Sequence, residues 1–340
     1  MVKNVQSVKF SFITSGMISR ALPLVIICIF LCACSSGRAQ EENSISGSGP
    51  TEEYRASFDA DSAYTYVNTL VGFGPRVPNT EAHRRAGDWL VEKMKGFGWD
   101  VIEQKAVLTA FDGTPLQARN IFAGLNPEKK ERTLLLAHWD SRPWADADPD
   151  VSRHKEPVPG ANDGASGVGV LLEIARQLSM MKSDAAVDIL FVDAEDWGSH
   201  NDEESWALGT RFFAANPPRK DYVPAQAILL DMVGSPDASF GYEYFSYEAN
   251  PALLQKIWNK AAKLGYGKYF HKGFGGAVTD DHVELIKKGI PAIDIIDYRN
   301  NQDYQGFDPV WHTTHDNMEN ISAETLRATG ETLISVLTQK

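Results

Sequence analysis

Residues 191–200 read FVDAEDWGSH, and this stretch decides which kind of fold the chain can adopt. The apolar run 187–192 predicts a short buried β-strand, and this strand ends in Asp193, Glu195 and Asp196. Three carboxylates within four residues repel one another, so a strand end that collects them needs compensating charge. A bound cation among these side chains is the compensation that we expect.

The chain from about residue 55 onward alternates between helical and strand patterns without an internal repeat or a second linker. This alternation is typical of a single α/β domain, which we place at residues 54–340. We expect a mixed, mostly parallel central sheet with helices on both faces. The predicted strands are 99–109, 118–125, 133–140, 187–196, 225–234 and 291–297, and the predicted helices are 62–74, 81–98, 160–178 and 322–339.

Residues capable of chemistry follow several of these predicted strands. His138 and Asp140 end one strand, the acidic residues 193–196 end the next, and Asp231 ends a third, while Asp163 opens a helix after a loop. In open α/β sheets, sites form at the carboxyl ends of the strands. We therefore expect these side chains to gather at one edge of the sheet.

The charge balance limits the partners. The chain carries a formal net charge of −12, and removal of a leader that contains Lys3, Lys9 and Arg20 makes the remainder more acidic. This balance argues against nucleic acid or an anionic membrane surface as the main partner. All three cysteines lie within the first 34 residues, so disulfides are excluded once that segment is removed.

The N-terminal stretch ISRALPLVIICIFLCACSS (18–36) has the layout of an export signal, with translation possibly beginning at Met17. Its LCAC segment resembles a bacterial lipobox, which implies cleavage before Cys34 and attachment of lipid to it. A plain secretory signal with incidental cysteines is the alternative. The polar residues 35–53 predict a flexible tether. We therefore expect an exported lipoprotein that faces the periplasm and contacts the membrane only through its N-terminal lipid.

Divalent cations such as zinc are bound by Asp, Glu and His. The separations between the candidates are tens of residues, so spacing alone does not specify a site. Each residue alone also has an ordinary explanation: Asp163 could be a helix N-cap, Asp231 could satisfy a turn, and Asp280 or Asp281 could cap a helix that begins near His282. For Asp281 we prefer the capping role, and for His282 a structural hydrogen bond. The candidate ligands are His138, Asp163, Glu195, Asp196, Asp231 and His312.

Seven segments in order resemble the zinc aminopeptidase superfamily and, within it, the animal-type glutaminyl cyclases. The resemblance runs from about residue 55 to the C-terminus. The segments are FGPRVPNTEAHRRAGDWL, LLLAHWDSRP, PGANDGASGVGVLLEIAR, FVDAEDWG, ILLDMVG, TDDHVELIKKGIPAI and VWHTTHDNMENIS.

The resemblance implies one catalytic zinc per chain and the cyclisation of N-terminal glutamine in peptides and proteins to pyroglutamate. Asp196 departs from the animal pattern, in which this ligand is usually Glu, and the loop that follows it also departs. The implied roles are zinc ligands for Asp163, Asp196 and His312, general acid/base for Glu195, an acidic network with it for Asp231 and Asp280, and pocket lining for Trp311, with Trp197 and Trp206 as further substrate-binding candidates.

Two other functions are considered. A two-zinc aminopeptidase of the same superfamily would use His138 and Asp231 for its second metal. Asp280 in TDDH, where such peptidases usually have Ser, and Trp311 before His312 favour the cyclase. A non-catalytic binding module is the third hypothesis, and the complete set of ligand types with Glu195 argues against it. We expect the protein to be a monomer.

Overall fold

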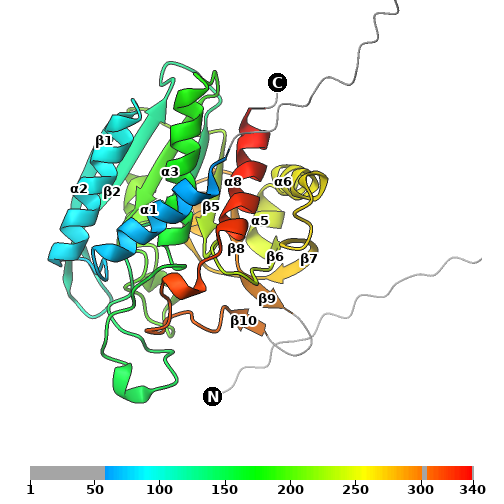
Figure 1. Cartoon of the computed structure of the whole chain (residues 1–340). Helices are drawn as coiled ribbons and strands as arrows, with labels where there is room; N and C mark the ends of the chain where they lie inside the picture. The colour runs from blue at the N-terminus through cyan, green and yellow to red at the C-terminus, as the bar shows by residue number, and fades with distance from the viewer. Residues whose placement is uncertain (1–57, 301–304, 339–340) are drawn as a thin grey trace, which may run out of the picture. The chain divides into compact units, whose positions relative to one another are not determined.

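The computed structural model describes residues 58–300 and 305–338. The expected signal segment, its acceptor Cys34 and the tether 35–53 lie outside these residues, so they stay predictions. Figure 1 shows a central sheet with helices packed against it. Among the described residues, no helix is both long and apolar enough to cross a membrane.

The central sheet is mixed and mostly parallel, as expected. Its strand order is β1-β2-β4-β3-β5-β8. The pairs β4–β3, β3–β5 and β5–β8 are parallel, whereas β1–β2 and β2–β4 are antiparallel. The six strands are β1 (Asp100–Thr109), β2 (Pro115–Leu125), β3 (Thr133–His138), β4 (Val187–Val192), β5 (Gln226–Asp231) and β8 (Ala292–Ile296).

Helices cover both faces of this sheet. One face packs against α1, α2, α3, α6 and α8, and the other packs against α4 and α7. The eighth helix, α5, lies beside β8. The helices are α1 (Ala60–Gly72), α2 (Glu81–Gly96), α3 (Ala165–Met180), α4 (Leu208–Ala215), α5 (Tyr244–Ala249), α6 (Pro251–Leu264), α7 (Asp281–Lys287) and α8 (Ala323–Leu337), with 3-10 turns η1 (Val151–Arg153), η2 (Glu203–Ser205) and η3 (Met318–Asn320).

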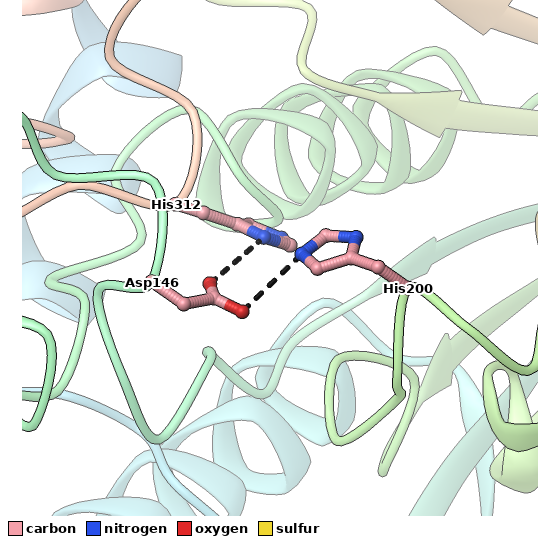
Figure 2. Close-up of side chains that lie close together, drawn as sticks. All are labelled: Asp146, His200 and His312. Carbon is pink, nitrogen blue, oxygen red and sulfur yellow. Dashed lines mark ion pairs between the residues drawn. The ribbon is translucent and has the colours of Figure 1, made fainter.

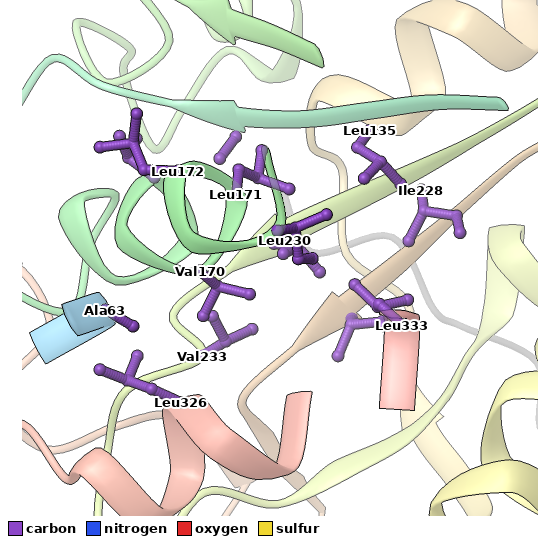
Figure 3. Close-up of a cluster of buried hydrophobic side chains, with 14 of the residues drawn as sticks. Ala63, Leu135, Val170, Leu171, Leu172, Ile228, Leu230, Val233, Leu326 and Leu333 are labelled. Atoms are coloured by element: carbon purple, nitrogen blue, oxygen red, sulfur yellow. The ribbon is translucent and has the colours of Figure 1, made fainter. Parts of the chain in front are cut away.

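The alternation of side chains along each strand produces two cores. In β5, for example, Ile228 and Leu230 face the α3 side, whereas Ala227 and Leu229 face the α7 side. Figure 3 shows the larger core, where side chains of α3 and α8 meet those of β3 and β5. The close packing requires Gly167, because a Cβ there would lie 2.3 Å from the carbonyl oxygen of Leu230. The strands β3, β4, β5 and β8 are therefore buried on both faces, and their functional groups lie at the strand ends.

Two small sheets were not predicted. The pair β6 (Phe240–Glu243) and β7 (Phe270–Gly276) is parallel and irregular, and the hairpin of β9 (Tyr298–Asn300) and β10 (Gln305–Phe307) follows β8 directly. Gly273, Gly275 and Gly276 interrupt the apolar alternation of β7, so sequence periodicity gives little signal there.

Glu243 joins β6 and α5 to α7. Its carboxylate lies 3.0 Å from Nε2 of His282 and accepts hydrogen bonds from the backbone of Phe245, Ser246 and Val278. The structural hydrogen bond expected for His282 is therefore present. Burial raises the pKa of Glu243, but the bonds to His282 and Ser246 outweigh it and lower this pKa to about 2.

We predict that Glu243→Gln destabilises the protein at neutral pH and much less in acid. The folded-state pKa lies below the ordinary value of 4.5, so the ionised carboxylate stabilises the fold above that pH and loses this contribution as the pH falls toward 2. The difference in unfolding free energy should be on the order of 3 kcal/mol at neutral pH and should shrink by pH ~3. Denaturant titrations of both proteins at the two pH values measure it.

The control is Glu92→Gln, which changes an exposed carboxylate on α2 and should alter stability by less than about 0.5 kcal/mol at either pH. An equal loss for Glu243→Gln at both pH values would show that the shape of this side chain matters rather than its charge.

Candidate active site

The carboxyl ends of β3, β4 and β5 and the start of α3 meet at one edge of the sheet, as expected. The ends of β4, β5 and β8 and the start of α3 line a pocket of about 300 Å³, whereas no side chain of β3 is among its lining residues. Its acidic and imidazole side chains are Asp163, Glu195, Asp196, His200, Glu203, Asp231, Asp280 and His312, and its aromatic side chains are Trp206, Tyr298, Phe307 and Trp311.

The structure brings the three predicted metal ligands together. Asp163, Asp196 and His312 are buried, and each offers a ligand atom within 4.8 Å of the other two. Nε2 of His312 lies 3.2 Å from Oδ1 of Asp196 and 3.6 Å from Oδ2 of Asp163. Ligand atoms of a tetrahedral zinc with bonds of about 2.0–2.1 Å are separated by roughly 3.3 Å. The spacing therefore suits a single small cation.

Unpaired buried atoms at the same place also suit a cation. Oδ2 of Asp196, Oδ1 of Asp231, Oδ2 of Asp280 and both ring nitrogens of His138 are buried and make no standard hydrogen bond among the described residues. Buried polar atoms without partners are costly, and they are typical of sites that hold an ion or a substrate. Two carboxylates and one imidazole form an ordinary donor set for zinc.

Asp163 is not a helix cap. The N-cap of α3 is Gly164, and no side chain caps this helix. The Asp163 carboxylate is instead free to face the pocket, while its backbone N–H donates to Oδ2 of Asp316 at 3.1 Å. Gly164 is required because a Cβ there would lie 2.4 Å from Nε2 of His138. The motif GANDGAS thus places the Asp163 carboxylate next to Gly164, where the backbone packs closely against His138.

The backbone after β4 turns so that Glu195 and Asp196 can take different roles. Ala194 has a φ of 54°, in the left-handed region, which redirects the chain at the strand end. The carboxylate of Asp140 then accepts the backbone N–H groups of Glu195 and Asp196, both at 3.2 Å. Asp193 is turned away from the pocket and lies 2.9 Å from Nε2 of His83. Asp193 therefore serves the structure of the turn.

Glu195 faces the pocket beside Asp196, and Asp231 and Asp280 line the same pocket. Burial raises the pKa of Glu195 well above 4.5, and the charges of Asp280 and Asp196 raise it further, against the opposing charge of His138. Burial likewise raises the pKa of Asp231 to about 7. These carboxyls therefore hold protons at a pH where ordinary carboxyls have lost them.

His138 lies among three acids. Its Nε2 is 2.9 Å from Oδ1 of Asp163 and 3.3 Å from Oδ1 of Asp231, and its Nδ1 is 3.5 Å from Oδ1 of Asp140. Burial lowers the pKa of His138, but its three acidic neighbours outweigh burial and raise it well above 6.5. These ligand types also fit a second metal ion. The geometry therefore suits His138 both as an ion-pair partner of the acids and as a ligand of that ion.

The residue that caps α7 differs from the expected one. Asp280, not Asp281, is the N-cap residue, and its side chain accepts from the N–H of Asp281 at 2.5 Å. Asp281 is the first residue of the helix and is fully buried. The helix begins one residue earlier than expected, so the capping role moves to Asp280, which also lines the pocket.

Of the three tryptophans named as substrate-binding candidates, the structure brings two to the pocket. Trp311 stacks on His312 with ring centroids 3.5 Å apart, and Trp206 stacks on the same ring at 5.9 Å. Trp197 is not among the pocket-lining residues and packs edge-on against Trp144 at 5.7 Å. Gly198 allows the Trp206 ring to pack closely against the backbone, because a Cβ there would lie 2.0 Å from that ring.

Several site residues lie outside the predicted set. Arg142 is buried, and its guanidinium lies 3.3 Å from Oδ1 of Asp196. Asp294 on β8 is fully buried, and burial and the charge of Asp280 raise its pKa well above 3.8. The sequence offered one signal, a high density of acidic residues: HWDSRPWADADPD (138–150) places four of them after a strand end. The residues missed are Asp140 as a backbone acceptor, Arg142, Asp146, His200, Asp294 and Asp316.

The family model "Peptidase family M28" matches residues 120–337. The Porphyromonas gingivalis glutaminyl cyclase structure is 51% identical with a TM-score of 0.79, and the match covers 82% of this chain and 96% of that one. A Zn-dependent exopeptidase from Parabacteroides distasonis is 49% identical with a TM-score of 0.81, covering 84% of this chain and all of that one.

A curated relative from cattle, glutaminyl-peptide cyclotransferase, is 26% identical over 236 residues, and the match spans 61% of this chain and 62% of the bovine protein. The region matched by the family model contains the pocket-lining ends of β4, β5 and β8 and the candidate ligands Asp163, Asp196 and His312. The chain belongs to peptidase family M28, with relatives that include bacterial and animal glutaminyl cyclases.

Proposed function

We propose that this protein converts the N-terminal glutamine of peptides and proteins to pyroglutamate and releases ammonia. The observation that most supports the proposal is the position of Glu195, a partly buried carboxyl beside the candidate ligand Asp196 in a pocket with aromatic walls. A pocket of about 300 Å³ has room for one side chain and its α-amine, which suits a reaction within a single residue. The relatives named as glutaminyl cyclases agree with this reaction.

The reaction forms a bond between the α-amino nitrogen and the side-chain amide carbon, and it breaks the bond from that carbon to the amide nitrogen. Because attack is intramolecular, the protein needs only to fold the substrate into the reactive geometry. Glu195 accepts a proton from the attacking nitrogen and returns it to the departing nitrogen, which leaves as ammonia. A carboxyl whose pKa is raised by burial suits both steps.

Asp231 and Asp280 assist the proton transfer by setting the charge around Glu195. Like charges in one buried site prevent full ionisation, so the set holds protons as a group. The backbone N–H of Asp281, which donates to Asp280, fixes the orientation of that carboxyl. Trp206 and Trp311 exclude water and provide flat surfaces for the aliphatic part of glutamine.

Asp163, Asp196 and His312 would hold a zinc ion, which when bound supplies a Lewis acid for the side-chain amide of the substrate. We propose one zinc per chain. The support is that Nε2 of His138 lies 2.9 Å from Asp163, at direct ion-pair distance, so a protonated His138 can compensate Asp163 and Asp231 without a second metal.

The reaction can be tested with the purified soluble part and two dipeptides, Gln-Ala and Leu-Ala, followed by mass spectrometry. We expect Gln-Ala to lose the mass of one ammonia and Leu-Ala to stay intact. Glu195→Gln should lower the cyclisation rate by about 10²–10⁴-fold because it removes the proton carrier while keeping the side-chain size. Release of free amino acids from either dipeptide would contradict the proposal and favour the aminopeptidase.

The zinc content distinguishes the same two functions independently. We expect one zinc per folded chain by elemental analysis, with loss of that zinc in Asp163→Asn and retention in His138→Gln. The two-zinc alternative, favoured by the proximity of His138, Asp163 and Asp231 and by the exopeptidase relative, predicts two zinc ions and loss of one in His138→Gln.

We further propose that residues 1–34 are an export signal, that residues 35–53 tether a single catalytic domain over 54–340, and that the enzyme acts as a monomer anchored by lipid at Cys34. The LCAC segment supports the anchor. In a bacterial host, Cys34→Ser should move the protein from the membrane fraction to the soluble fraction, as detected by fractionation and immunoblotting. An unchanged distribution would favour a plain secretory signal.

A further inference from the structure

Asp146 lies in the loop after β3, outside the predicted site, and its carboxylate is firmly held. Arg142 donates from Nε to Oδ1 at 2.8 Å and from NH2 to Oδ2 at 2.6 Å, and Nε1 of Trp144 donates to Oδ2 at 3.2 Å. Two hydrogen bonds from one guanidinium favour the ionised form of this carboxylate. Asp146 is therefore an ionised carboxylate with a fixed orientation.

Two imidazole rings face this carboxylate, as Figure 2 shows. Oδ2 lies 3.2 Å from Nε2 of His200, and Oδ1 lies 3.5 Å from Nδ1 of His312. His200 is half exposed and lines the pocket, whereas His312 is almost fully buried. One carboxylate therefore links a pocket-wall side chain with a candidate metal ligand.

The two nitrogens of His312 have different surroundings. Nε2 faces Asp163 and Asp196, whereas Nδ1 is buried, makes no standard hydrogen bond among the described residues and faces Asp146. A neutral imidazole carries its proton on one nitrogen and offers a lone pair from the other. An anionic acceptor beside Nδ1 favours the proton there, which leaves the lone pair of Nε2 directed toward Asp163 and Asp196.

The same arginine connects Asp146 to a second candidate ligand. NH1 of Arg142 lies 3.2 Å from the carbonyl oxygen of Asp196 and 3.3 Å from its Oδ1. Arg142 thereby holds Asp196 in place directly, and it holds His312 in place through Asp146. A shift of roughly 0.5 Å brings Oδ1 of Asp146 to normal hydrogen-bond length from Nδ1 of His312.

We propose that Asp146 is a positioning residue for metal binding: it sets the tautomer and ring orientation of His312, so that Nε2 is the nitrogen that binds the ion. The inference rests on the proposed zinc site of Asp163, Asp196 and His312. Mutation of an outer carboxylate that orients a histidine ligand typically weakens metal affinity by about 10–100-fold. Asp146 thus acts on the metal without touching it.

The test measures zinc affinity of the metal-free protein by competition with a chelator of known affinity, without any substrate. We expect Asp146→Asn and Asp146→Ala to weaken zinc binding by about 10–100-fold, with Ala having the larger effect because it also removes the acceptor. Thermal unfolding of the metal-free variants confirms that they fold, and Asp146→Asn serves if Asp146→Ala does not.

Two matched controls separate positioning from local structure. Asp150→Asn changes an exposed carboxylate that caps η1 in the same loop, and His200→Gln removes the other imidazole on Asp146. Both should leave zinc affinity within about threefold of wild type. A loss in His200→Gln as large as that in Asp146→Asn would overturn the assignment of the effect to His312.

A third variant separates this inference from the proposed function. Asp163→Asn should weaken zinc binding severely because it removes a ligand. Wild-type affinity in Asp146→Asn together with a loss in Asp163→Asn would overturn the role of Asp146 and leave the metal site standing. Wild-type affinity in Asp163→Asn would overturn the metal site and this inference with it.

Discussion

Mutual repulsion among buried carboxylates is the constraint on which the rest of this structure depends. The carboxyl edge of the sheet gathers acids that are almost completely buried, and each would be costly to ionise without compensation. The structure compensates them with backbone N–H groups, with His138 and His312, and with two buried arginines, Arg76 and Arg142. The buried acids are Asp140, Asp163, Asp193, Asp196, Asp231, Asp280, Asp281, Asp294 and Asp316.

The need to compensate these buried carboxylates explains residues that lie far from the pocket. Arg76 comes from the loop between α1 and α2, yet its guanidinium donates to the carbonyl oxygens of Trp139, Pro159 and Gly160. It ties the end of β3 to the loop before α3 and places a positive charge near Asp316 and Asp140. Burial lowers its pKa to about 10, so the guanidinium remains charged at neutral pH. The segment FGPRVPNT is therefore part of the site's support although it supplies no pocket residue.

The sequence predicted the sheet well because its parallel strands are short, apolar and bounded by polar residues. The strands β3, β4, β5 and β8 are buried on both faces, so their apolar runs are almost continuous. Asp163, Asp196 and His312 could be named only through family resemblance, because loops bring them together from distant parts of the chain.

The arrangement of loop side chains could not be read from periodicity. Asp146 and His200 meet across two loops, and Trp206 rather than Trp197 lines the pocket. The Asp280 cap differs from the expected Asp281 by a single residue, which is within the ordinary uncertainty of a helix boundary. Such details depend on tertiary contacts that local sequence does not encode.

The wide separation of the candidate ligands along the chain has a consequence for biogenesis. Asp163 precedes α3, Asp196 follows β4 and His312 lies near the C-terminal helix, so the three meet only after the parallel strands have assembled. In the unfolded chain long loops separate these groups, so holding one metal ion there carries a loop-closure entropy cost that the folded sheet has already met. A chain crossing a membrane unfolded would therefore carry no assembled metal site, and loading with metal would follow folding at the destination.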